Sequence, residues 1–228
     1  MTRFALPSPH KIKSTNFRLQ RVQAVNPLRG GHHQAVDLGE PVWMADIETT
    51  PLSQAQSGAW KSLLMKLRGA LRTLLLHDVS RPRPLAYASS SDTAVRIGRG
   101  VRIGEARRIG GVAHAWGAPR IIAVDRANSR IQVDTFTAGA TISPGDYCAW
   151  AVGFARPWFS VTDAATADSA GRAWLSVEPA PPAYSTALPA ALEMFEPAGE
   201  FTVLQSSAPY SPPTHSVSLQ AAQVLRRS

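Results

Sequence analysis

The chain has 228 residues, a net charge of +8, one cysteine, 44% hydrophobic residues and 18% charged residues. This composition is too apolar for a disordered chain, and the single Cys148 excludes an intramolecular disulfide framework or a cysteine-rich zinc site. Apolar runs stay below the roughly 18 residues of a membrane-spanning helix, and the N-terminus lacks the apolar segment of a signal peptide. We therefore expect a globular protein without membrane insertion, made in a reducing cytoplasm.

Positive charge is concentrated in the first half of the chain. Residues 1–110 contain 17 Lys and Arg against 7 Asp and Glu, whereas residues 111–228 contain 7 against 9. Most of the basic residues are arginine, which forms planar bidentate pairs with carboxylates and also contacts phosphate. The asymmetry favours either stacking of copies, basic face to acidic face, or a basic half that faces DNA.

The first predicted elements are β-strands. Residues 1–13 are interpreted as a polar N-terminal arm. Beyond it, alternation from Phe17 to Val25 predicts a half-buried strand with Phe17, Leu19 and either Val22 or Val25 pointing inward. Two more strands are predicted over residues 34–38 and 41–49.

The pattern predicts one helix, over residues 53–69. Ser53 and Gln56 have the spacing of a capping box, in which each side chain satisfies an amide of the first turn. Gly69 is placed to end the helix. The apolar residues of this segment fall at the spacing of one buried helix face: Ala59, Trp60, Leu63, Leu64 and Leu67.

The second half of the chain is predicted to consist of short strands. Turn signals separate them at intervals of about 8–12 residues, which is typical of a small barrel or sandwich. After a strand at 71–76, the predicted strands are 120–124, 131–135, 147–152, 158–161, 173–177, 192–195, 201–205 and 216–225.

These elements predict a mainly β protein of β-sandwich or barrel units, with one conspicuous helix packed on the first sheet. We expect residues 14–87 and 184–228 to form a ring-forming β-sandwich-like domain, because neither segment alone has enough strands to cover both helix and sheet. Residues 88–183 are predicted to form an inserted small β-barrel or sandwich domain.

A glycine-rich segment at residues 96–111 carries the densest cluster of arginines. Its glycines miss the spacing of a dinucleotide-binding loop, and no helix pattern follows. The segment is interpreted as a glycine-rich hairpin, or as a contact for phosphate or an acidic partner. Its candidate residues are Arg96, Arg99, Arg102, Arg107 and Arg108.

The sequence contains no convergent catalytic or metal-binding set. His32 and His33 are adjacent, so on a strand they point to opposite faces, and Cys148 lies in an apolar strand where a buried, inert thiol is expected. Asp163 and Asp168 flank a turn, where aspartate normally bonds the local backbone. We therefore expect no catalytic residues, no metal and no cofactor.

Tryptophans of the inserted region have two interpretations. Trp150, Trp158 and Trp174 all lie in predicted strands, where they would either pack in the core or form an aromatic surface that binds sugar. The second interpretation makes the insert a carbohydrate-binding module for host recognition.

Three passages together resemble proteins of siphophage tails. The first is Pro41–Glu48 followed by Trp60 and Leu67-Arg68-Gly69; the second is Gly145-Asp146-Tyr147 leading to Trp158–Val161. The third runs from Thr162 to Ala173 and on to Val177-Glu178-Pro179. On these passages the chain is similar to the distal tail protein, a ring that joins the tail tube to the tail tip.

That resemblance implies a bacteriophage virion protein, made in the host cytoplasm, that acts by self-assembly and docking rather than by catalysis. The implied partners are further copies in a hexameric ring, the tail tube protein, the tail-tip or hub proteins, and DNA in transit. Open alternatives are a head–tail connector, a tail terminator, a minor tail protein, or the carbohydrate-binding module.

Overall fold

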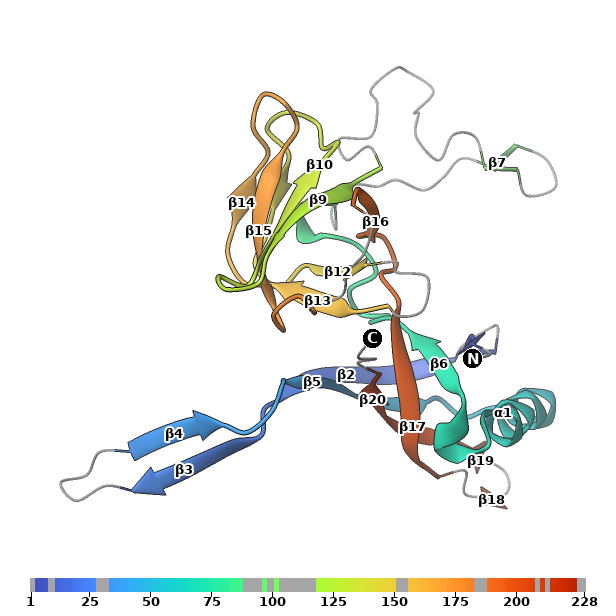
Figure 1. The fold of residues 1–228 in the computed structure, drawn as a ribbon. Helices are drawn as coiled ribbons and strands as arrows, with labels where there is room; N and C mark the ends of the chain where they lie inside the picture. The colour runs from blue at the N-terminus through green and yellow to red at the C-terminus, as the bar shows by residue number, and fades with distance from the viewer. Residues whose placement is uncertain are drawn as a thin grey trace. The chain divides into compact units, whose positions relative to one another are not determined.

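A computed structural model of the protein contains two β-rich units (Figure 1). The sheet unit comprises Met1–Ser80 and Ala198–Arg226, and the barrel unit comprises Arg81–Pro197 and Arg227–Ser228. The structure describes residues 3–7, 11–27, 33–87, 96–97, 101–102, 118–150, 156–182, 188–207, 210–211 and 214–224.

The sheet unit contains a six-stranded sheet with β2 at one edge and β1 at the other. Most neighbours are antiparallel, whereas β1 and β6 are parallel. In sheet order the strands are β1 (Arg3–Phe4), β6 (Thr73–Leu76), β17 (Gly199–Ser207), β20 (Ser218–Gln223), β5 (Val42–Thr49) and β2 (Ile12–Gln20).

Alternation along the central strands gives this sheet one apolar and one polar face. On β5, Trp43, Ala45 and Ile47 are buried on the first face, while Glu48 is exposed on the second. Phe17 of β2 lies opposite Ala45 and therefore faces the core. The sequence prediction for residues 41–49 is confirmed, because a period of two places successive side chains on opposite faces.

Helix α1 (Gln54–Leu67) packs on this sheet, as predicted. Ser53 accepts a hydrogen bond from the Gln56 amide, and the Gln56 side chain accepts one from the Ser53 amide, so the capping box is confirmed. Trp60, Leu63 and Leu67 form the buried face of the helix. The chain then enters a short 3-10 helix, η1 (Gly69–Leu71), instead of the strand start predicted at residue 71.

The predicted strand from Phe17 to Val25 is divided in two. After β2 ends at Gln20, the chain leaves the sheet and pairs as β3 (Gln23–Pro27) with β4 (His33–Asp37) in a separate two-stranded hairpin. Val22 and Val25, one of which was expected to point inward, are 52% and 55% exposed. The prediction of inward burial was wrong here because the hairpin has no covering layer within the described residues.

The barrel unit is a closed barrel of six strands. Its core includes Ile131, Phe159 and Leu175, all fully buried. In order around the barrel the strands are β10 (Arg130–Asp134), β15 (Ala173–Glu178), β13 (Trp158–Val161), β12 (Tyr147–Trp150), β16 (Ala190–Glu193) and β9 (Arg120–Asp125).

The unit boundaries differ from those predicted. The barrel unit begins at Arg81 rather than at residue 88, and β16 belongs to it although it lies in the predicted return segment. A barrel closes only when its last strand pairs with its first, so β16, between β9 and β12, is needed for closure. The predicted arm, residues 1–13, contributes β1 to the sheet and also contains the start of β2.

The remaining elements are short. No helix in the described ranges is long and apolar enough to cross a membrane. The short elements are η2 (Leu85–Tyr87), β7 (Arg96–Ile97) paired with β8 (Val101–Arg102), β11 (Thr141–Ile142) with β14 (Ala165–Thr166), and β18 (Tyr210–Ser211) with β19 (Thr214–His215).

Candidate functional site

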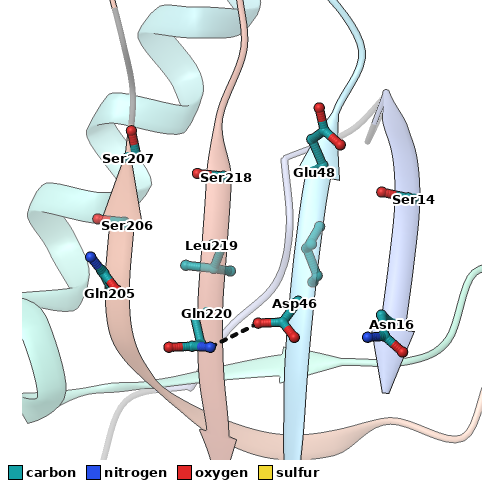
Figure 2. A pocket seen from close by; sticks show the side chains of 11 residues that line it. Ser14, Asn16, Asp46, Glu48, Gln205, Ser206, Ser207, Ser218, Leu219 and Gln220 are labelled. Atoms are coloured by element: carbon teal, nitrogen blue, oxygen red, sulfur yellow. Dashed lines mark hydrogen bonds between the residues drawn. The ribbon is translucent and has the colours of Figure 1, made fainter. Parts of the chain in front are cut away.

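The polar face of the six-stranded sheet carries a shallow groove of about 430 Å³ (Figure 2). Strands β2, β5, β20 and β17 contribute its lining, and Figure 2 shows the polar side chains rising from neighbouring strands. The main polar residues are Asn16, Asp46, Glu48, Gln205, Ser218 and Gln220. The groove therefore offers hydrogen-bond donors and acceptors rather than an apolar cavity.

Both carboxylates in the groove already have partners. Asp46 accepts a hydrogen bond of 3.0 Å from Gln220 Nε2 and forms an ion pair of 3.0 Å with Arg18. Glu48 pairs with Lys13 at 3.0 Å. Among the described residues, no group of three His, Cys, Asp or Glu side chains could hold a metal ion. The arrangement suits hydrogen bonding to a polar surface.

The β3–β4 hairpin is a second candidate surface. Ala24 lies opposite Val36, and the Leu38 amide donates to the Val22 carbonyl at 2.8 Å, so these four side chains share one side of the ribbon. Val22, Val36 and Leu38 are each about half exposed or more. We call this set the apolar hairpin face.

The opposite side of the hairpin is more polar. It carries Val25 opposite Ala35, and Gln23 opposite Asp37, whose carboxylate accepts a hydrogen bond of 2.7 Å from Gln23 Nε2. In a two-stranded ribbon neither side has a sheet beneath it, and such hairpins are marginally stable alone in water. An exposed apolar side on such a ribbon is therefore typical of a surface that a partner covers.

Sequence reasoning missed the apolar hairpin face. The signal that could have found it is Gly30-Gly31 between two alternating apolar segments, since glycines at such a position favour a hairpin. The sequence prediction instead placed Val22 or Val25 on the inward side of a half-buried strand that continued from Phe17.

The predicted arginine cluster is only partly within the described residues. Arg96 and Arg102 lie directly opposite each other on β7 and β8, in an antiparallel hairpin. Arg99, Arg107 and Arg108 lie outside the described residues. The contact of this cluster with phosphate or with an acidic partner therefore stays a prediction.

The three predicted surface tryptophans do not form a common surface. Trp150 belongs to the barrel core, and Trp158 is fully buried and stacks on Tyr147 with ring centroids 4.3 Å apart. Only Trp174 is exposed, at 42%. The sequence left core packing and surface exposure open for all three, because an apolar strand residue is compatible with either side of a barrel wall.

Trp174 lies within a small polar cluster on the barrel. The guanidinium of Arg130 lies 5.3 Å from the Trp174 ring centroid and pairs with Asp125 at 2.9 Å. Hydrogen bonds from the side chains of Asn128 and Arg130 hold the pKa of Asp125 below its ordinary value. The cluster combines a cation over an aromatic ring with an ion pair, and each interaction orients Arg130.

The single thiol and two further carboxylates have structural roles. Burial raises the pKa of the Cys148 thiol to about 12, with a further contribution from Asp146, so this thiol is inert in the folded barrel. Asp78 accepts hydrogen bonds from Thr15 and from the amide and hydroxyl of Ser80. Asp168 accepts from the amides of Ala170 and Arg172, as expected of aspartate at a turn.

Comparison with known protein families finds no family model that matches the sequence, and comparison with curated proteins finds no match. The resemblance to distal tail proteins therefore rests on the sequence passages alone.

Proposed function

We propose that this protein is a non-enzymatic structural subunit of a bacteriophage virion, a distal tail protein that assembles into a ring between tail tube and tail tip. The observation that supports self-assembly is the apolar hairpin face, formed by Val22, Ala24, Val36 and Leu38. Assembly would cover this face and stabilise a hairpin that is marginal by itself. The phage assignment rests on the sequence resemblance.

The features of the sheet unit agree with an assembly role. Strand β2 presents nine residues at a sheet edge, and exposed edges are templates for contact with another chain. The groove on the polar face has its carboxylates paired rather than poised for proton transfer. In the described part of the chain, the open strand edge and the paired carboxylates of the groove therefore suit contact with another protein.

The test is the mass of the full-length protein in solution, measured by light scattering behind a sizing column at several concentrations. A discrete oligomer, in particular one of six chains, is the expected result. Repeating the measurement at high salt separates apolar contacts, which persist, from exposed ion pairs, which are screened. A strict monomer at every concentration would overturn the self-assembling ring.

A carbohydrate-binding module is the second candidate, and exposed Trp174 is the observation that favours it. Aromatic rings presented on a β-surface stack on sugar rings, and Arg130 beside Trp174 adds hydrogen-bond donors. A glycan array would decide: binding that Trp174→Ala abolishes and Leu188→Ala preserves supports this candidate. Leu188 is a matched control because it is also an exposed apolar residue of the barrel unit.

A further inference from the structure

A second exposed apolar site lies at the C-terminal end of α1. Met65 is 75% exposed and Leu71, in η1, is 69% exposed. Gly69 and Ala70, both exposed, lie between them in the chain. We call Met65 and Leu71 with these small residues the helix-end patch. Contact with another chain would remove both side chains from water, which is favourable.

The helix-end patch lies in strongly basic surroundings. Residues 54–76 contain four basic and no acidic residues. Lys66 and Arg68 are exposed beside the patch. By contrast, the described hairpin segments, residues 21–27 and 33–40, contain one basic residue, Arg21, against two acidic residues, Asp37 and Glu40, a net charge of −1. The two apolar surfaces therefore have flanking charges of opposite sign.

The two surfaces belong to opposite edges of the same sheet. The hairpin extends from β2 and β5 at one edge, whereas η1 leads into β6 and packs beside β17 toward the other edge. Figure 1 shows the hairpin and α1 at opposite ends of the sheet unit. Surfaces at opposite edges are suited to head-to-tail contact between copies, and such heterologous contacts close rings when the rotation permits.

We propose that the apolar hairpin face of one copy packs on the helix-end patch of the next copy. This inference rests on the proposed self-assembly and names its contact. Val22, Val36 and Leu38 supply the apolar side chains on one copy, and Met65 and Leu71 supply them on the other. The net negative charge of the described hairpin and the basic Lys66 and Arg68 beside the patch steer the approach, since charges at an interface rim govern encounter and register more than affinity.

Engineered cysteines test this contact directly. The only native thiol, Cys148, is buried, so new surface cysteines react alone. A mixture of Val36→Cys and Leu71→Cys chains, oxidised under mild conditions, is expected to form disulfide-linked dimers of the two variants. The double variant Val36→Cys/Leu71→Cys is expected to give a ladder of covalent oligomers on a denaturing gel.

Val25→Cys is the matched control. Val25 lies on the same hairpin at similar exposure, but on the opposite side from Val36. Its cross-linking to Leu71→Cys is expected to be about tenfold weaker, because a disulfide needs the two Cβ atoms within about 4.5 Å. Equal yields from Val25→Cys and Val36→Cys would overturn the proposed packing.

Charge substitutions supply a second measurement. Val36→Asp is expected to raise the protein concentration needed for assembly by about tenfold or more, because it buries an unpaired charge at the interface. Val25→Asp is expected to change it by less than about threefold, and circular dichroism checks that both variants fold. If the wild type assembles and both variants assemble equally well, this contact is overturned while the proposed function stands. A wild type that never assembles overturns both.

Discussion

The barrel unit and the sheet unit differ in whether their strand edges are paired or left open. In the barrel, β9 pairs with both β10 and β16, so the ring of strands closes and leaves no long edge. In the sheet unit, β2 is a nine-residue edge strand, and β1 pairs with only two residues of β6. Closure removes the sites at which another chain can pair, whereas an open sheet keeps them.

Both units combine a buried core with exposed apolar side chains. The barrel encloses residues such as Trp150 and Phe159 in one core. The sheet unit buries Trp60 under its helix but leaves the hairpin and the helix end apolar and exposed. The barrel unit has exposed apolar side chains of its own, among them Leu85 and Trp174, so the two units differ in the closure of their strand edges rather than in the presence of exposed apolar residues.

The largest expected effect is that of Trp60→Ala in the sheet unit. Trp60 is 1% exposed, and removing its indole leaves a cavity that should cost about 4 kcal/mol. Far-ultraviolet circular dichroism during denaturation follows α1, the one α-helix of the described residues. Met65→Ala, at an exposed position of the same helix, should change stability by less than about 0.5 kcal/mol. Equal effects would place Trp60 outside the core.

Gly171→Ala should destabilise the barrel by about 3 kcal/mol. A Cβ at this position would lie 2.2 Å from the backbone oxygen of Phe136, and the backbone φ is +72°. Gly139→Ala is the control, because its φ is +78° but no atom lies within 4 Å, so only about 1 kcal/mol of backbone strain is expected. The rate at which Cys148 is alkylated reports opening of the barrel.

The helix signal and Cys148 alkylation report on different units and can be measured on the same sample. Trp60→Ala should weaken the helix signal without accelerating alkylation, and Gly171→Ala should do the reverse. If both signals change together in both variants, the two units unfold as one cooperative structure. The units then differ in their exposed strand edges but do not have separate stabilities.

Ser53→Ala should cost about 1 kcal/mol in the sheet unit, because it removes the hydroxyl that accepts from the Gln56 amide. Ser62→Ala is the matched control. Ser62 is exposed within α1, where alanine is the better helix former, so no loss is expected. Chemical denaturation followed by circular dichroism measures both, and an unchanged midpoint for Ser53→Ala would show that the capping box contributes nothing.

Asp125→Asn should have the smallest effect, visible as altered acid sensitivity of the barrel. The pKa of Asp125 lies below its ordinary value because Asn128 and Arg130 bond its ionised form. This carboxylate therefore stabilises the fold at pH above its unfolded pKa, and that contribution is lost as pH falls through the folded pKa. The variant should lose less stability than the wild type between pH of about 7 and about 3. Identical losses would contradict the role of these bonds.

Local patterns predicted the secondary structure of this chain well. Ser53 and Gln56 at capping-box spacing, followed by apolar residues on one helix face, determined where α1 begins and what it buries. Alternation over residues 41–49 likewise predicted β5 and its inward side. These features depend on interactions within a few residues, so a single sequence contains their signal.

The surfaces were decided by contacts between distant segments. Val25 continues the alternation of Phe17 and Leu19, yet it is exposed because the chain turns away from the sheet to pair with residues 33–37. Trp158 and Trp174 occupy similar strands, yet one is buried and one exposed.

The mainly β class, the single helix with its cap and most strand positions thus follow from patterns within the sequence. Tertiary structure alone decided that β16 closes the barrel, that the hairpin projects with an apolar side, and which tryptophan reaches solvent. The physical reason is that periodicity specifies which side chains share a face, while burial of that face depends on what packs against it from elsewhere in the chain.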